Sequence, residues 1–218
     1  MTVSLSESIE DIFDDVKDAL VGNARRESFL QFAEKYDLSY QKRMRSTELD
    51  LAVLTLNFFG KRKKQRLKNV LTSYDQKTAS KLLIFDVHRS KTPKKKTTCV
   101  LLESDLLNLP RYCFRPKRSV EKVTALFKAN QRSLARYPEL QRSMVLEAKH
   151  MEYMQRYLTE QLADMILSNK ATTIEGIDDW LLIYQEDKRV EVSDLLSFRS
   201  YAIALAEILL FDHSNDLV

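Results

Sequence analysis

Two closely spaced apolar runs constrain the fold of this chain more than any other feature. KLLIFDVHR (81–89) and TTCVLLE (97–103) are rich in β-branched and aliphatic residues, and the polar segment SKTPKKK (90–96) separates them. Two such runs with a short polar connection are typical of antiparallel neighbours in a sheet. We therefore expect a β-hairpin whose loop, residues 90–96, is exposed and basic.

Further strands are expected on both sides of this hairpin, in segments 70–76, 109–115, 143–148 and 172–192. In LPRYCFR (109–115), alternation places Tyr112 and Phe114 on one face and Arg111, Cys113 and Arg115 on the other. The last segment has the length of a second hairpin, and its polar EDKR (186–189) is the expected turn.

Helices are expected where apolar residues recur at spacings of three and four, in segments 24–36, 119–129, 150–168 and 193–211. The chain also begins with such a stripe, which predicts an amphipathic helix over 4–20. Residues 48–59 are apolar without a clear period and predict neither helix nor strand. Together these elements predict an α+β fold class: an antiparallel sheet of short strands covered by helices, with an N-terminal amphipathic helix.

The domain organisation that we expect is simple. Residues 1–22 form the N-terminal helix, and residues 23–218 form one α+β domain, long enough at this size to bury a core. A loose order of strands followed by a helix occurs twice. The domain therefore divides into two loosely similar halves, about 23–118 and 119–218.

Composition excludes several classes of protein. Glycine occurs only at positions 22, 60 and 176, so neither a Gly-rich phosphate loop nor a dinucleotide fingerprint is present. Two cysteines cannot build a disulfide framework, and cysteine and histidine are too scattered for a metal site. No apolar run approaches the roughly 18–20 residues that span a bilayer, and the acidic start is unlike a signal peptide. We expect a cytoplasmic protein without a transmembrane segment, metal or cofactor.

Charge is distributed unevenly along the chain. Residues 61–118 hold 17 Lys and Arg against 4 Asp and Glu, a net charge of +13, whereas the flanks carry −4 and −5. Three basic clusters account for much of the excess: Lys61, Arg62, Lys63, Lys64, Arg66 and Lys68; then Lys94, Lys95 and Lys96; then Arg115, Lys117 and Arg118. Such clusters suit contact with an anionic partner, through counterion release at each phosphate. A solvated basic face, or one paired with the acidic flanks, is the structural alternative.

Asp86 and His88 are the candidate catalytic residues. Asp86 and His88 lie two residues apart on an expected strand and therefore share a face, where an aspartate can orient a histidine base. A strand-end histidine beside a basic loop is the structural alternative. We expect Cys99 and Cys113 to be buried as small apolar residues.

The middle of the chain resembles a bacterial family of uncharacterised α+β proteins, soluble or membrane-tethered. The resemblance lies in Ile84-Phe85-Asp86-Val87-His88, in the threonine-bearing Thr97-Thr98-Cys99-Val100-Leu101-Leu102 and in Leu109-Pro110-Arg111-Tyr112-Cys113-Phe114-Arg115-Pro116, and it covers about residues 24–210. Val87 stands where the family has an aromatic residue. The resemblance implies an α+β domain and no particular activity.

These features support three hypotheses for the function. The leading one is a non-enzymatic binding or accessory module whose basic central surface (61–118) meets a nucleic acid backbone, an anionic membrane or an acidic protein. The second is an enzyme of unrecognised type with its site near Asp86 and His88. The third is an interaction module that docks, or forms a homodimer, through helix 4–20.

Overall fold

The computed structural model describes residues 23–60, 65–88, 96–118 and 134–214. The expected helices 4–20 and 119–129 lie outside these residues, as do Lys61, Arg62, Lys63, Lys64, Lys94 and Lys95.

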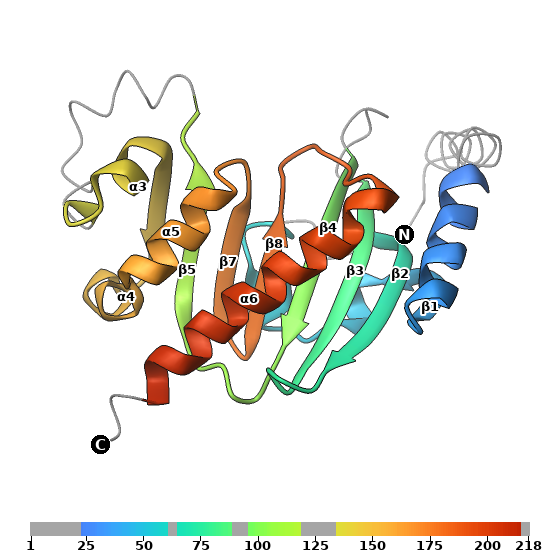
Figure 1. The fold of residues 1–218 in the computed structure, drawn as a ribbon, viewed down its shortest axis with the longest axis horizontal. Helices are drawn as coiled ribbons and strands as arrows, with labels where there is room; N and C mark the ends of the chain where they lie inside the picture. The colour runs from blue at the N-terminus through green and yellow to red at the C-terminus, as the bar shows by residue number, and fades with distance from the viewer. Residues whose placement is uncertain (1–22, 61–64, 89–95, 119–133, 215–218) are drawn as a thin grey trace, which may run out of the picture.

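The centre of the fold is an eight-stranded sheet in the order β1-β2-β3-β4-β8-β7-β5-β6. Every neighbouring pair is antiparallel, which confirms the expected fold class. The strands are β1 (Ser39–Arg45), β2 (Arg66–Asp75), β3 (Ser80–His88), β4 (Lys96–Glu103), β5 (Leu109–Pro116), β6 (Met144–Ala148), β7 (Thr173–Asp178) and β8 (Trp180–Tyr184). The strands of the first half of the chain, β1–β4, lie on one side of the sheet and β5–β8 on the other (Figure 1).

The hairpin expected from the two apolar runs is confirmed. β3 pairs with β4 from Lys81 opposite Glu103 to His88 opposite Lys96. The connection is displaced by one residue from the expected 90–96, because β3 ends at His88 and Lys96, which is half-buried, is the first residue of β4. Alternation along β5 is also as expected, since Tyr112 and Phe114 face the helices.

Helices cover one face of the sheet. They are the helix at residues 23–35, α3 (Pro138–Ser143), α4 (Met151–Tyr157), α5 (Glu160–Ser168) and α6 (Leu195–Ser214). Figure 1 shows α6 running diagonally across the middle of the sheet, with α3, α4 and α5 over the β5–β6 side. Phe29, Phe32 and Ala33 are buried, so the apolar residues of the helix expected over 24–36 face the core. Apolar contact with the sheet, more than helix propensity, holds such helices in place.

The second face of the sheet is covered by residues 46–60, which include the segment 48–59 that has no clear period. It contains two short 3₁₀ turns, η1 (Ser46–Glu48) and η2 (Val53–Thr55), and buries Phe58 and Phe59 against β8 and its neighbours. Glu175 of β7 holds its end in place: the carboxylate accepts the Phe58 N–H at 2.8 Å and the Tyr184 hydroxyl at 2.7 Å. A segment without helix or strand periodicity therefore forms a third layer, on the face of the sheet opposite the helices.

Two expected elements were wrong in detail. The helix expected over 150–168 is two helices, because Thr159 is extended and its Oγ1 accepts the Leu162 N–H at 3.2 Å as an N-cap for α5. The second hairpin turns at Asp178 and Asp179, since Ile177 pairs with Trp180. Asp178 takes the left-handed conformation (φ 49°) that aspartate tolerates in tight turns. Residues 186–189 instead connect β8 to α6.

Gly176 gives a test of packing between β5 and β7. A Cβ at this position would lie 2.4 Å from the ring of Tyr112, its direct neighbour on β5. We expect Gly176→Ala to lower the free energy of unfolding by about 1–3 kcal/mol, the usual cost of overpacking, in urea unfolding. In a Tyr112→Leu background the same change should cost clearly less. Equal costs in both backgrounds would contradict this packing.

Candidate functional site

A buried ion pair joins the helix at 23–35 to the sheet. Asp86 of β3 is fully buried. The Arg25 guanidinium donates two parallel hydrogen bonds to its carboxylate, from Nε to Oδ2 at 2.7 Å and from Nη2 to Oδ1 at 3.0 Å. This fork-to-carboxylate geometry is the strong form of an ion pair. The Arg25 guanidinium also lies 4.9 Å from the centre of the Phe29 ring, one turn along the same helix.

Three further segments converge on the same pair. Thr98 of β4 donates its hydroxyl to Asp86 Oδ1 at 2.7 Å, and the Asn69 amide of β2 donates to Oδ2 at 3.1 Å. Arg25 Nη2 also donates to the Val190 carbonyl at 2.9 Å, in the connection between β8 and α6. One buried charge pair therefore links a helix, three strands and a loop.

The surroundings of Asp86 fix its charge. Burial by itself would raise the pKa of the Asp86 carboxyl, but the hydrogen bond and charge of Arg25, the Thr98 hydroxyl and the charge of Arg189 together hold that pKa below its usual value. The carboxylate is ionised, and its oxygens already accept four hydrogen bonds.

This geometry bears on the hypothesis of catalysis at Asp86 and His88. A general base must be able to take a proton, whereas Asp86 is saturated with donors and has a lowered pKa. The structure gives it a role in holding the fold together. The backbone of His88 pairs with Lys96, and its side chain is outside the described residues. An enzyme site at this pair stays a prediction.

The described members of the basic clusters lie at the same end of the sheet. Strand direction alternates, so β2 and β4 start where β3, β8 and β5 end. Arg66 and Lys68 begin β2, Lys96 begins β4, and Arg115 ends β5 with Lys117 and Arg118 just beyond it. Arg43 and Arg45 at the end of β1 lie at the same end. We call these eight residues the basic end. In Figure 1 this end is the upper edge of the sheet.

Most of these cations already have interaction partners within the protein. Arg115 pairs with Glu147 on β6, Nη2 to Oε1 at 2.8 Å, and Arg118 pairs with Glu186 at 3.4 Å. Lys117 donates to the Gln141 carbonyl. The carboxylates in these pairs are 48% and 52% exposed, and exposed pairs contribute little stability. An incoming anion can therefore replace them at small cost.

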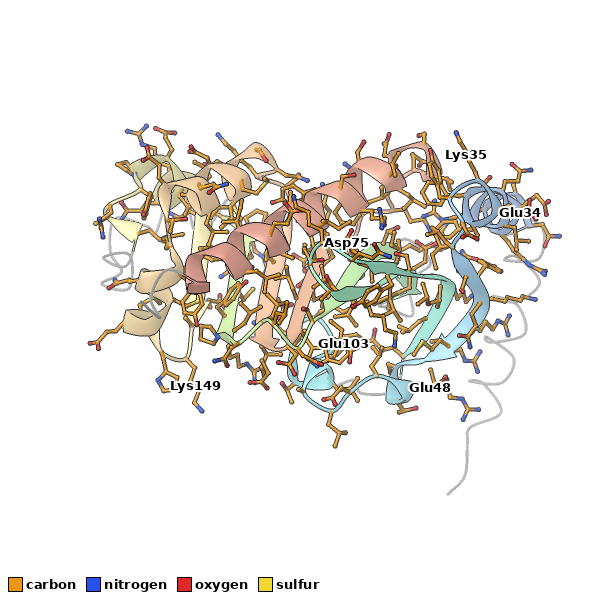
Figure 2. The ribbon with its side chains drawn as sticks, turned by 60° about the horizontal axis from the view of Figure 1, so that its bottom comes forward. Glu34, Lys35, Glu48, Asp75, Glu103 and Lys149 are labelled. Carbon is orange, nitrogen blue, oxygen red and sulfur yellow. The ribbon has the colours of Figure 1, made fainter. Side chains whose placement is uncertain are left out.

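At the opposite end of the sheet, acidic side chains of the described residues outnumber the basic ones, which include Lys77 and Lys81. Asp75 ends β2, Glu103 ends β4 and Asp178 ends β7, and Figure 2 shows Asp75 and Glu103 at this edge. Partial burial, with the nearby charges of Asp105, Asp178 and Asp50, raises the pKa of the Asp179 carboxyl. The sheet thus carries opposite charge at its two ends.

Sequence reasoning did not find Arg25 or Asn69. Arg25 stands on the expected helix as one of many charged residues, and nothing in its pattern marks it as buried. Asn69 has φ 52°, at an irregularity where β2 carries one extra residue between Lys68 and Leu71. The two cysteines are both buried, as expected. Within the described ranges, no three His, Cys, Asp or Glu side chains gather as metal ligands would.

Comparison with known proteins supports the fold. No protein-family model matches the chain, and no curated protein sequence matches it. A solved structure is similar: the crystal structure of the mycobacterial trehalose monomycolate transport factor A, TtfA, with a TM-score of 0.59 and 11% sequence identity. The match covers 84% of this chain and 93% of that one. At this identity the likeness shows an α+β fold alone.

The helices of the described part of the chain do not reach across a bilayer. None of them combines the length and the hydropathy that spanning requires. The resemblance to an uncharacterised bacterial family stays a prediction.

The buried ion pair predicts a large loss of stability on truncation. We expect Asp86→Ala to lower the free energy of unfolding by about 3–5 kcal/mol, because it leaves the Arg25 guanidinium buried without its counter-charge. The matched control is Arg142→Ala, which removes an exposed pair with Glu139 and should cost below about 1 kcal/mol. Similar losses in urea unfolding for both variants would contradict the role of Asp86.

The same pair predicts a pH dependence. Because the folded-state pKa of Asp86 is lowered, its contribution is complete above the unfolded pKa of about 3.9 and is lost as pH falls through the folded value. The difference in unfolding free energy between wild type and Asp86→Asn should thus be largest above about pH 5 and shrink below about pH 4. A difference that is constant from neutral pH to about pH 3 would argue against an ionised Asp86.

Proposed function

We propose that this protein is a non-enzymatic binding module whose basic end contacts the phosphate backbone of a nucleic acid. The observation that carries the proposal is convergence: basic clusters far apart in the sequence have described members at one end of one sheet. Lysine and arginine side chains at strand ends can contact phosphates, and such contacts do not depend on the base sequence of the nucleic acid.

The distribution of exposed apolar side chains favours a nucleic acid over a membrane. Binding at a membrane surface combines basic residues with apolar side chains that insert beside them. Among the described residues, the three most exposed large apolar side chains are Leu51, Tyr74 and Leu106, and each neighbours an aspartate in sequence. Those aspartates, Asp50, Asp75 and Asp105, belong to the acidic group at the opposite end.

Opposite charge at the two ends favours oriented approach. A dipolar molecule is turned by the field of a polyanion, and the basic end leads while the acidic end is repelled. The similar structure is that of a transport factor, which is compatible with a role without catalysis. It is not the basis of the proposal.

Salt dependence tests the proposal. With about six phosphate contacts, affinity for a DNA duplex should fall by on the order of a thousandfold between about 50 and 200 mM salt, measured by fluorescence anisotropy. Replacing Lys94, Lys95 and Lys96 with Ser should make the slope of log affinity against log salt clearly shallower, by about 0.9 for each phosphate that is no longer neutralised.

The control variant removes three other lysines. Lys35 ends the helix that precedes the start of β1, Lys77 is in the turn between β2 and β3, and Lys81 is near the start of β3, so all three lie away from the basic end. Their replacement by Ser makes the same change in net charge and should leave the slope near that of wild type. Absence of duplex binding at about 50 mM salt, or equal slopes for the two triple variants, would overturn the proposal.

A further inference from the structure

A cleft lies on the second face of the sheet, and it adjoins the basic end only through the pair between Glu147 and Arg115. It has a volume of about 390 Å³ and lies where the covering segment 46–60 stops short of β5 and β6. Leu56 and Asn57 line it from the covering segment, Cys113 from β5 and Glu175 from β7, and Arg111, Glu147 and Lys149 contribute charged groups. Its volume is within the range of about 300–1,000 Å³ typical of small-molecule sites.

The two acidic groups of the cleft are already engaged. Glu147 accepts the Arg115 guanidinium, with Nε and Nη2 at 2.9 and 2.8 Å from the same oxygen. Glu175 accepts the backbone N–H groups of Asn57 and Phe58, and the Tyr184 hydroxyl, at 2.5–2.8 Å. Both carboxylates therefore have donors within the protein, and the donors to Glu175 are buried with it.

The two cations of the cleft have no acidic partner among the described residues. Arg111 donates one N–H to the Thr55 carbonyl, and neither Arg111 nor Lys149 forms an ion pair with any residue that the structure describes. They are opposite each other, because the Lys149 N–H donates to the Arg111 carbonyl at 3.2 Å beyond the pairing of β5 with β6. Like charges in directly opposed positions are destabilising, and an anion between them would remove that cost.

Cys113 gives the cleft an uncharged surface. Burial, followed by the charges of Glu175 and Glu147, raises the pKa of the Cys113 thiol to about 12, so it remains protonated at neutral pH. With Leu56 beside it, this thiol offers an apolar surface next to the two cations. A ligand that fits both the pair of cations and the apolar surface beside them has one anionic group and an apolar body.

We propose that this cleft binds a small organic carboxylate with a short apolar tail. The Arg111 guanidinium takes the carboxylate with its remaining N–H groups, since the planar fork matches two oxygens, and the Lys149 ammonium contacts it from the neighbouring strand. The tail lies on Leu56 and Cys113. Arg115 of the basic end pairs with Glu147 in the lining, but the ligand contacts proposed here are Arg111 and Lys149, so this proposal does not rest on the proposed function.

The test is an NMR titration of the full chain with hexanoate, using amide shifts of residues 111–113 and 147–149. Hexanoate should produce saturable shifts there. Inorganic phosphate, which has no apolar tail, and hexanol, which has no carboxylate, should each bind at least tenfold more weakly. Arg111→Gln and Lys149→Gln should each raise the hexanoate Kd at least tenfold. Arg136→Gln and Lys170→Gln, which remove exposed cations elsewhere, should leave it unchanged.

Folding is checked separately, because Arg111 also supports the covering segment through Thr55. Lys149 contributes no side-chain ion pair to the described part of the fold, so Lys149→Gln keeps the test valid if Arg111→Gln unfolds. Absence of saturable shifts with hexanoate would overturn the proposal. Equal binding of hexanoate and phosphate, or equal Kd values for the Lys149→Gln and Lys170→Gln variants, would also overturn it.

Discussion

The bidentate contact between Arg25 and Asp86 is the interaction on which the described structure most depends. A carboxylate with no exposed surface is costly to bury unless it is paired and hydrogen-bonded. Here the helix at 23–35, β2, β4 and the connection to α6 each supply a donor or an acceptor to the pair. Displacing any of these segments leaves a buried charge short of a partner, so the pair specifies how the helix and loop sit on the sheet.

The antiparallel order of the strands then determines the distribution of charge. Strands that alternate in direction bring the start of β2, the start of β4 and the end of β5 to one end of the sheet, although these positions are far apart in the sequence. Asp75 and Glu103 end β2 and β4 on the opposite side. A chain with a net charge of only +4 thereby acquires two ends of opposite sign.

Much of the fold could be predicted from the sequence because its strong signals are local. The β3–β4 hairpin, the alternation along β5 and the helix α6 depend on patterns within about twenty residues. The covering layer at 46–60 could not be predicted, because irregular backbone has no period and its contacts are with distant strands. Nor could the tight turn at Asp178 and Asp179, since the more polar EDKR nearby gave the stronger turn signal.

The candidate sites show the same limit. The basic clusters are visible in the sequence, but their common location depends on strand order, which no single segment reveals. In the sequence Asp86 stands out for its neighbour two residues away, whereas its partner is Arg25, 61 residues away. The cleft between Arg111 and Lys149 depends on the pairing of β5 with β6 and on where the covering segment ends. Long-range pairing, more than residue type, determines what these side chains can do.

The basic end acts as one binding surface if the proposed function is right. The most direct measurement is a backbone amide NMR map of the protein with a short DNA duplex at low salt. We predict shifts that cluster at the start of β2, the start of β4 and the end of β5, near Arg66, Lys96 and Lys117. Shifts centred on Asp75 and Glu103 at the opposite end, or spread evenly over the sheet, would contradict a single surface at the basic end.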